Sequence, residues 1–241
     1  MPKKKKTSNK NLPASKLPAP SREEKIPLHK MSDITWRIFR IMSEFVEGFQ
    51  FLSQFKKEVT IFGSTRLSED NKWYKEATKM GELLAEAGYT VITGGGPGIM
   101  EAANKGAFKV DPKKSVGINI ELPKEQRINP YVGSSHAFYY FFTRKVMLAA
   151  SAQAYIYFPG GFGTSDELFE MITLIQTKKM QPVPVVLIDK NFWQPFIEWV
   201  ENKMVKEYHT VDMKERKIFK VCNSATEAMK YIKTSKERTI F

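Results

Sequence analysis

The sequence contains very little cysteine, since Cys222 is the only one in 241 residues. No internal disulfide can form, and such a chain suits a reducing compartment. Apolar runs of about 18 residues are also missing, so we expect no membrane span. The basic N-terminus is not followed by an apolar segment, which argues against a secretory signal. We therefore predict a cytoplasmic protein without a membrane partner.

Metal and cofactor motifs are missing as well. His29, His136 and His209 lie far apart and have no metal-ligand spacing, so we predict no metal. No Gly-Lys-Ser/Thr follows a glycine cluster, which excludes a Walker A loop. The dinucleotide fingerprint fails too, because its third glycine, counted from Gly94, would fall on Ile99. We predict no cofactor.

The formal net charge is +12, and it is unevenly distributed. Residues 1–30 contain nine Lys or Arg and two Glu, which accounts for more than half of the excess. Their Lys run and prolines predict a disordered basic tail, either a solvated leader or a targeting or polyanion-binding segment. The rest of the chain is only mildly basic, so we do not predict a nucleic-acid partner. Residues 31–241 are predicted to form a single Rossmann-like nucleotide-binding domain.

The ordered part should begin with an amphipathic helix that has Ser32 as its N-cap. Apolar residues recur there at spacings of three and four: Ile34, Ile38, Ile41, Phe45, Phe49 and Leu52. Such a helix precedes the sheet, and it can cover a sheet edge or form a dimer.

Strand and helix patterns then alternate along the chain. The predicted strands are residues 59–62, 89–93, 115–120, 154–158, 183–188 and 219–221. The predicted helices are residues 69–87, 99–108, 164–178 and 224–232, with two more starting near Thr143 and Phe192. The aromatic segment 137–142 is predicted to be extended. This alternation indicates an α/β fold, a Rossmann-like doubly wound parallel sheet with helices on both faces.

Two glycine clusters each follow a predicted strand and precede a helix. One runs from Gly94 to Gly98, and the other from Pro159 to Gly163. Glycine lets the backbone approach a ligand closely, and a helix N-terminus offers free N–H groups to an anion. Together they predict a phosphate site. The alternative is that the glycines only shape tight turns.

Charged residues near these clusters are further candidates. Glu121 follows the third strand, where an acid holds ribose hydroxyls in nucleotide-binding folds; otherwise it is an exposed loop acid. Arg144 and Lys145 can clamp phosphate, or form a surface salt bridge. Glu167 follows the second glycine cluster, near the expected sugar; the alternative is stabilisation of the helix dipole.

These residues, taken together, resemble the LOG-type phosphoribohydrolase family, also labelled "possible lysine decarboxylase". The family motif PGGxGTxxE occurs as PGGFGTSDE, from Pro159 to Glu167, and a companion stretch as GGGPGIMEAANKGA, from Gly94. NIELPKEQ and FFTRKVML lie between them, and FGSTR, at Phe62 to Arg66, resembles the family's first strand-end loop. The similarity covers roughly residues 58–235.

The resemblance implies hydrolysis of nucleoside 5′-monophosphates to base and ribose 5-phosphate, by a homodimer or larger homo-oligomer. It implies a catalytic pair, Arg144 and Glu167, in which Glu167 stabilises an oxocarbenium-like state. It implies substrate-binding roles for Ser64, Arg66, Gly95, Gly96, Glu121, Lys145, Gly160, Gly161, Gly163, Thr164 and Asp166. Ser165 replaces a commoner Leu, and Asp166 replaces the Glu of plant members, which leaves the identity of the base open.

Two other functions remain open at this point. A nucleic-acid binder would depend on the charge of residues 1–30 and would lose its main activity without them. A non-catalytic nucleotide-binding or sensing protein on the same fold would bind nucleotide but would not need Glu167 for turnover. The decarboxylase label has little chemical support, because a pyridoxal enzyme needs a Schiff-base lysine in a recognisable motif and none is present.

Overall fold

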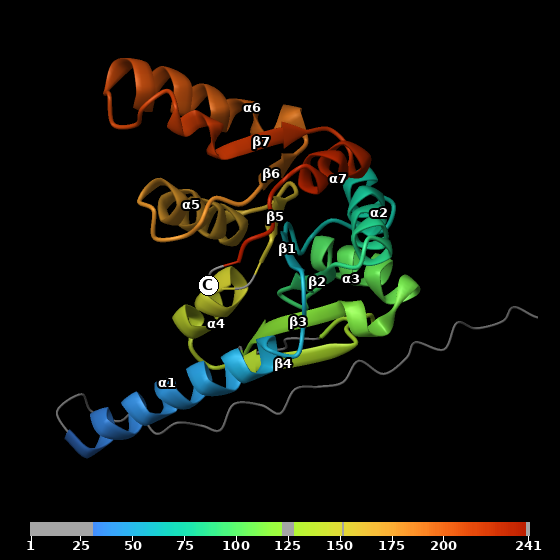
Figure 1. Ribbon diagram of the computed structural model, residues 1–241, viewed down its shortest axis with the longest axis vertical. Coiled ribbons are helices and arrows are strands. Elements are labelled where there is room, and N and C mark those ends of the chain that lie inside the picture. The colour runs from blue at the N-terminus through green and yellow to red at the C-terminus, as the bar shows by residue number, and fades with distance from the viewer. Residues whose placement is uncertain (1–30, 122–127, 151, 240–241) are drawn as a thin grey trace, which may run out of the picture.

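The computed structural model describes residues 31–121, 128–150 and 152–239 (Figure 1). The tail predicted for residues 1–30 lies outside this part of the chain. The helices are α1 (Met31–Leu52), α2 (Lys72–Glu86), α3 (Ile99–Val110), α4 (Phe141–Ala150), α5 (Phe162–Gln176), α6 (Lys190–Trp199) and α7 (Ala225–Lys233). The strands are β1 (Glu58–Phe62), β2 (Thr90–Thr93), β3 (Ser115–Ile120), β4 (Ser134–Phe138), β5 (Ala154–Tyr157), β6 (Val185–Ile188) and β7 (Phe219–Cys222). Shorter helical segments are η1 (Pro112–Lys114), η2 (Val200–Glu207, a π-helix) and η3 (Glu215–Ile218).

All seven strands form one parallel sheet in the order β4-β3-β2-β1-β5-β6-β7. Every residue of β1, β2, β3, β5 and β6 is buried. This is why apolar residues of these strands point to both faces, since a parallel sheet is covered on both sides. The predicted fold class is confirmed.

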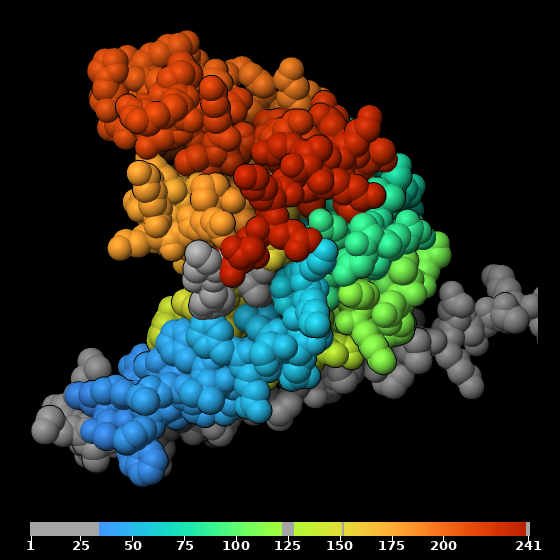
Figure 2. Space-filling model, in the orientation of Figure 1, coloured from blue at the N-terminus to red at the C-terminus, as the bar shows by residue number. Residues whose placement is uncertain are grey.

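Helices cover the two faces of the sheet in two groups. Apolar side chains of α2, α3 and α7 pack on one face, and those of α4, α5 and α6 pack on the other (Figure 1). Helix α1 lies against α4 and β4 at the end of the second layer (Figures 1 and 2). None of the helices in the described part of the chain is long and apolar enough to cross a membrane.

The direction in which the sheet is built reverses between β1 and β5. From β1 the chain adds β2, β3 and β4 on one side, and it then returns to place β5 on the other side. In open α/β sheets, ligands bind outside the carboxyl ends of the strands at such a switch point. The fold therefore places the loops that follow β1 and β5 at the expected binding position.

The prediction for residues 137–142 was wrong over its second half. Strand β4 ends at Phe138, and α4 already begins at Phe141. Aromatic residues favour strands, but a tertiary contact overrides this preference here. The Glu44 carboxylate accepts hydrogen bonds from the main-chain N–H groups of Tyr139 (2.7 Å) and Tyr140 (3.4 Å). These bonds occupy donors just before the helix and favour its early start.

Other helix starts also differ from the prediction. Helix α2 begins at Lys72 and not at residue 69, because the Asn71 side chain accepts from the N–H of Trp73 and caps the helix there. Helix α1 begins at Met31, so Ser32 lies inside it and is not its N-cap. Helix α5 begins at Phe162, directly after an extended Gly161. Helix α6 begins at Lys190, because the Asp189 side chain accepts from the N–H of Asn191 and caps the helix there.

Candidate active site

A cavity of about 660 Å³ lies at the switch point of the sheet. The loops that follow β1, β2 and β5 surround it, together with the first turns of α4 and α5. Nine predicted site residues line it: Ser64, Arg66, Arg144, Gly160, Gly161, Gly163, Thr164, Asp166 and Glu167. Four others do not line it: Gly95, Gly96, Glu121 and Lys145. The structure thus brings residues from distant parts of the sequence to one cavity.

The loop after β1 is held between two other loops. The Ser64 N–H donates to the carbonyl of Pro159 (3.0 Å), which ties the loop to the segment after β5. The Ser64 carbonyl accepts from the N–H of Ile99 (2.9 Å), the first residue of α3. Gly98 makes this approach possible, because its φ is 72° and a Cβ there would collide with the Ser64 carbonyl.

The glycine cluster after β2 rests on a buried polar network. The Gly95 N–H donates to Thr93 Oγ1 (2.9 Å), and the Gly95 carbonyl accepts from the N–H of Asn129 (2.9 Å). The Gly96 carbonyl accepts from Asn129 Nδ2 (3.0 Å), and Asn104 links Thr93 to Asn129. The main-chain groups of these two glycines thus bind the buried network, and neither glycine lines the cavity.

Gly94, which we did not single out, is the glycine of this cluster that lines the cavity. A Cβ at Gly94 would lie 2.5 Å from Arg144 Nη2, so a side chain there would displace the guanidinium. Its position directly after the predicted strand 89–93 was the available signal.

The loop after β5 leads into an open helix N-terminus. Gly161 is the N-cap of α5, and no side chain of the described residues caps this end. A Cβ at Gly161 or Gly163 would meet nothing within 4 Å. Because the first N–H groups of a helix have no partner inside it, this end can hold an anion such as phosphate.

Glu167 is a buried carboxylate in the second turn of α5, and its exposed fraction is 7%. The Tyr157 hydroxyl donates to the main-chain carbonyl of Glu167 (3.1 Å). The Oε2 atom has no hydrogen-bond partner among the described residues. Burial raises the pKa of this carboxyl to about 7, although Lys145 and Arg144 nearby lower it. A group near neutrality can exchange a proton at working pH.

Arg144 lies in the first turn of α4 and lines the same cavity. Its Nε donates to the carbonyl of Ile118 in β3 (2.9 Å). Burial lowers the pKa of Arg144, and the charge of Glu167 opposes that shift. An arginine remains charged at neutral pH, so the cavity holds a fixed cation beside a titratable carboxyl.

Lys145 does not line the cavity, and its side chain contacts α5. Its Nζ lies 2.8 Å from Asp166 Oδ2 and 3.0 Å from Glu170 Oε2. Burial lowers the pKa of Lys145, but the hydrogen bonds to both carboxylates outweigh it and raise the pKa overall. Lys145 thus joins α4 to α5, which carry Arg144 and Glu167 respectively.

Glu121 directly follows β3, and its N–H donates to the carbonyl of Phe138 (2.8 Å). Arg66 is exposed at the rim, and its N–H donates to Ser64 Oγ (3.1 Å).

The prediction missed several apolar residues that line the cavity: Phe62, Leu67, Met100, Phe141, Phe162 and Phe192. Phe162 is 97% exposed, which is unusual for so large an apolar side chain. Its place inside the motif PGGFGT could have revealed it.

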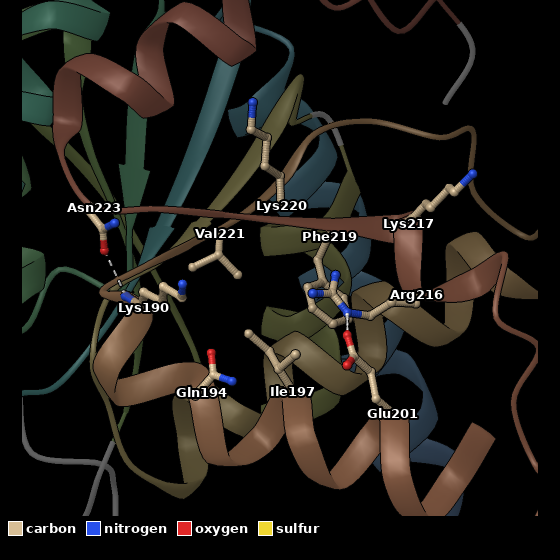
Figure 3. Close-up of a pocket in the computed structure, with 10 residues that line it drawn as sticks. All are labelled: Lys190, Gln194, Ile197, Glu201, Arg216, Lys217, Phe219, Lys220, Val221 and Asn223. Atoms are coloured by element: carbon tan, nitrogen blue, oxygen red, sulfur yellow. Dashed lines mark hydrogen bonds and ion pairs between the residues drawn. The ribbon is translucent and has the colours of Figure 1, made fainter. Parts of the chain in front are cut away.

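A second cavity, of about 530 Å³, lies between β7 and α6 (Figure 3). Arg216 is its most central cation, and its Nε donates to Glu201 Oε1 (2.8 Å). The guanidinium also lies 4.8 Å from the centre of the Phe219 ring. Lys217 and Lys220 extend away from α6 in Figure 3, and the Lys220 amine lies over the ring of Tyr231. No buried carboxylate lines this cavity.

The segment that carries Arg144 and Glu167 resembles part of known proteins. A family model described as "Possible lysine decarboxylase" matches residues 100–232, which include Arg144 and Glu167. The chain belongs to this family, the LOG family. The cytokinin riboside 5′-monophosphate phosphoribohydrolase LOG of Oryza sativa is 29% identical over 153 residues, which are 62% of this chain and 62% of that protein. A cytokinin riboside 5′-monophosphate phosphoribohydrolase of Rhodococcoides fascians is 25% identical over 184 residues, 74% of this chain and 90% of that protein.

The fold of this LOG family member also occurs in solved structures. The molybdenum cofactor carrier protein of Chlamydomonas reinhardtii superposes with a TM-score of 0.51 at 21% identity, over 74% of this chain and 97% of that one. At this identity the likeness concerns the fold alone.

Proposed function

We propose that this protein hydrolyses the N-glycosidic bond of nucleoside 5′-monophosphates and releases a free base and ribose 5-phosphate. AMP-like nucleotides are the proposed substrates, including N6-modified ones, since the relatives in Oryza sativa and Rhodococcoides fascians are named for cytokinin nucleotides. The observation that carries the proposal is the buried Glu167 carboxylate beside Arg144, in a cavity next to the open N-terminus of α5.

The open end of α5 is suited to the phosphate. Its unpaired N–H groups and the positive end of the helix dipole favour a dianion. Arg144 adds a positive charge that can hold phosphate or ribose oxygens. Phosphate binding far from the reacting bond would supply the energy that orients the sugar.

Glu167 is suited to the chemical step. As the bond between C1′ and the base nitrogen breaks, positive charge develops on the sugar, and an ionised carboxylate beside it stabilises that charge. Water then forms the new bond to C1′ and loses a proton, and the departing base gains one. A carboxyl with a pKa of about 7 is suited to accept that proton from water.

The proposed active form is a homodimer or larger homo-oligomer. Large apolar side chains are exposed along α1 and at the start of α4: Trp36, Ile38, Phe39, Met42, Val46, Phe141 and Phe142. Exposed apolar surface of this extent marks an interaction site. Light scattering at micromolar concentration should give at least twice the chain mass, and a monomer mass would contradict it. The cytoplasmic location stays a prediction.

The decisive experiment incubates the full chain with a panel of nucleoside 5′-monophosphates and scores free base by chromatography. AMP-like substrates should be cleaved much faster than their nucleosides, because only the nucleotide carries the phosphate. Equal rates on AMP and adenosine would contradict the phosphate site. Tight AMP binding without base release would instead support the non-catalytic nucleotide-binding function.

A further inference from the structure

The N-terminal helix α1 makes specific polar contacts with the turn that precedes α4. Residues 31–52 lie outside the segment that the family model matches, yet they pack against the helix that carries Arg144. The approach is close, because a Cβ at Gly48 would lie 2.7 Å from Met147 Sδ in α4. Contacts at this turn can therefore set the position of Arg144.

Glu44 supplies the central contact. Its Oε1 accepts from the Tyr139 N–H (2.7 Å) and its Oε2 from the Tyr140 N–H (3.4 Å). The buried Thr143 hydroxyl lies 2.5 Å from Glu44 Oε2 and 2.7 Å from the Tyr140 carbonyl. A carboxylate at this position satisfies free donors and is favoured by the helix dipole.

Two arginines of α1 hold the same turn from one side. The Arg37 guanidinium lies 5.6 Å from the centre of the Tyr140 ring, and that of Arg40 lies 4.9 Å from the Tyr139 ring. Their spacing with Glu44 places all three on neighbouring turns of one face of α1.

The turn that Glu44 contacts, residues 139–140, leads directly to Arg144. The Arg144 N–H donates to the carbonyl of Tyr140 (3.3 Å), which is the first turn of α4. The Arg144 side chain then donates through Nε to the Ile118 carbonyl. We infer that Glu44 is a positioning residue, which fixes the start of α4 so that the Arg144 guanidinium stays in the cavity. This inference rests on the proposed function of Arg144.

The first test measures the position of Arg144 without any substrate. Hydrogen exchange of the Arg144 Nε–H, followed by NMR, should be about tenfold faster in Glu44→Gln than in the wild type. The substitution removes the negative charge of Glu44 and replaces one of its two acceptor oxygens by an amide NH2 group. Glu47→Gln is the matched control on the same helix, since Glu47 is exposed and accepts from Ser43 Oγ. Equal exchange rates in Glu44→Gln and the wild type would overturn the inference.

The second test uses the reaction with AMP. Glu44→Gln should lower kcat roughly tenfold, since displacing a catalytic group by a fraction of an ångström is costly. The same substitution in an Arg144→Ala background should have almost no further effect, because Glu44 acts through Arg144. Equal losses in both backgrounds would indicate a merely structural role and overturn the inference.

A third variant covers the case in which Glu44→Gln does not fold. Glu44→Asp keeps the charge but shortens the side chain, so the carboxylate no longer reaches the N–H groups of Tyr139 and Tyr140. Exchange of the Arg144 Nε–H should be faster than in the wild type, and kcat should be lower. Wild-type values in both measurements would overturn the inference. A wild-type protein that cleaves no nucleotide would refute the proposed function, while the exchange measurement would still decide the role of Glu44.

Discussion

Two cavities in the described part of the chain differ little in volume, but they differ in whether their charged side chains have partners. Beside α6, Arg216 is paired with Glu201 and packs on Phe219. Beside α5, the Glu167 carboxylate is buried and its Oε2 lacks a partner within the described residues. An unpaired buried acid costs stability, and such costs persist where function requires them. Pairing of charge, more than cavity size, therefore distinguishes the candidate active site.

The strongest way to break this comparison is to neutralise Glu167. Glu167→Gln should lower kcat for AMP by roughly 10²-fold or more and change KM little, because the carboxylate acts mainly in the transition state. Steady-state kinetics on the purified protein measures both constants. Glu201→Gln, in the other cavity, is the matched control and should turn over normally. Near wild-type kcat in Glu167→Gln would end the catalytic assignment.

The same substitution should stabilise the protein at alkaline pH. The folded state holds the Glu167 proton up to a pKa of about 7, whereas the unfolded chain releases it near 4.5. Stability from this group is thus complete below pH 4.5 and is lost as the pH rises to 7. Glu167→Gln avoids the loss, which amounts to roughly 3 kcal/mol at pH 8.

Thermal melting at two pH values checks this expectation. The variant should melt at a higher temperature than the wild type at pH 8, and the two midpoints should converge near pH 4.5. A variant that melts earlier at pH 8 would indicate that the Glu167 charge is stabilising, as the helix-dipole alternative requires.

Replacement of Arg144 sharpens the comparison between the two arginines. Arg144→Ala should raise KM for AMP about tenfold and also lower kcat, since a charged hydrogen bond to the substrate is lost. Arg216→Ala should leave both constants unchanged, because Arg216 is engaged with Glu201. Equal effects of the two substitutions on KM would contradict a specific role for Arg144.

The smallest effect is expected in the second cavity. Glu201→Gln removes an ion pair whose side chains are 26% and 36% exposed, so it should cost no more than about 1 kcal/mol. Denaturant unfolding at neutral pH measures the difference. A loss of several kcal/mol would mean that this pair is as critical to the fold as a buried one.

Sequence patterns predicted the sheet, and nine of the thirteen predicted site residues line the cavity at its switch point, because strand ends depend on local signals. Apolar runs followed by glycine clusters indicated strand ends, and the parallel topology brings those ends together. The position of Gly95 and Gly96 outside the cavity lining was harder to predict. The Gly96 carbonyl accepts from Asn129, which lies 33 positions further along the chain, and no local signal reveals such a contact. The early start of α4 was missed for the same reason, since Glu44 caps it from another helix.

The position of β5 has a consequence for the order in which the strands pair during folding. Strands β1 to β4 are neighbours in both sequence and space, so they can pair while the rest of the chain is still being synthesised. The pairing of β1 with β5 joins Val59 to Ala154 and has to close a much longer loop. Until then one edge of β1 stays open, and the segment that carries Glu167 has no place to dock. The nascent half-sheet is therefore expected to be the stage most prone to aggregation, and catalytic competence should arise only in the last steps of folding.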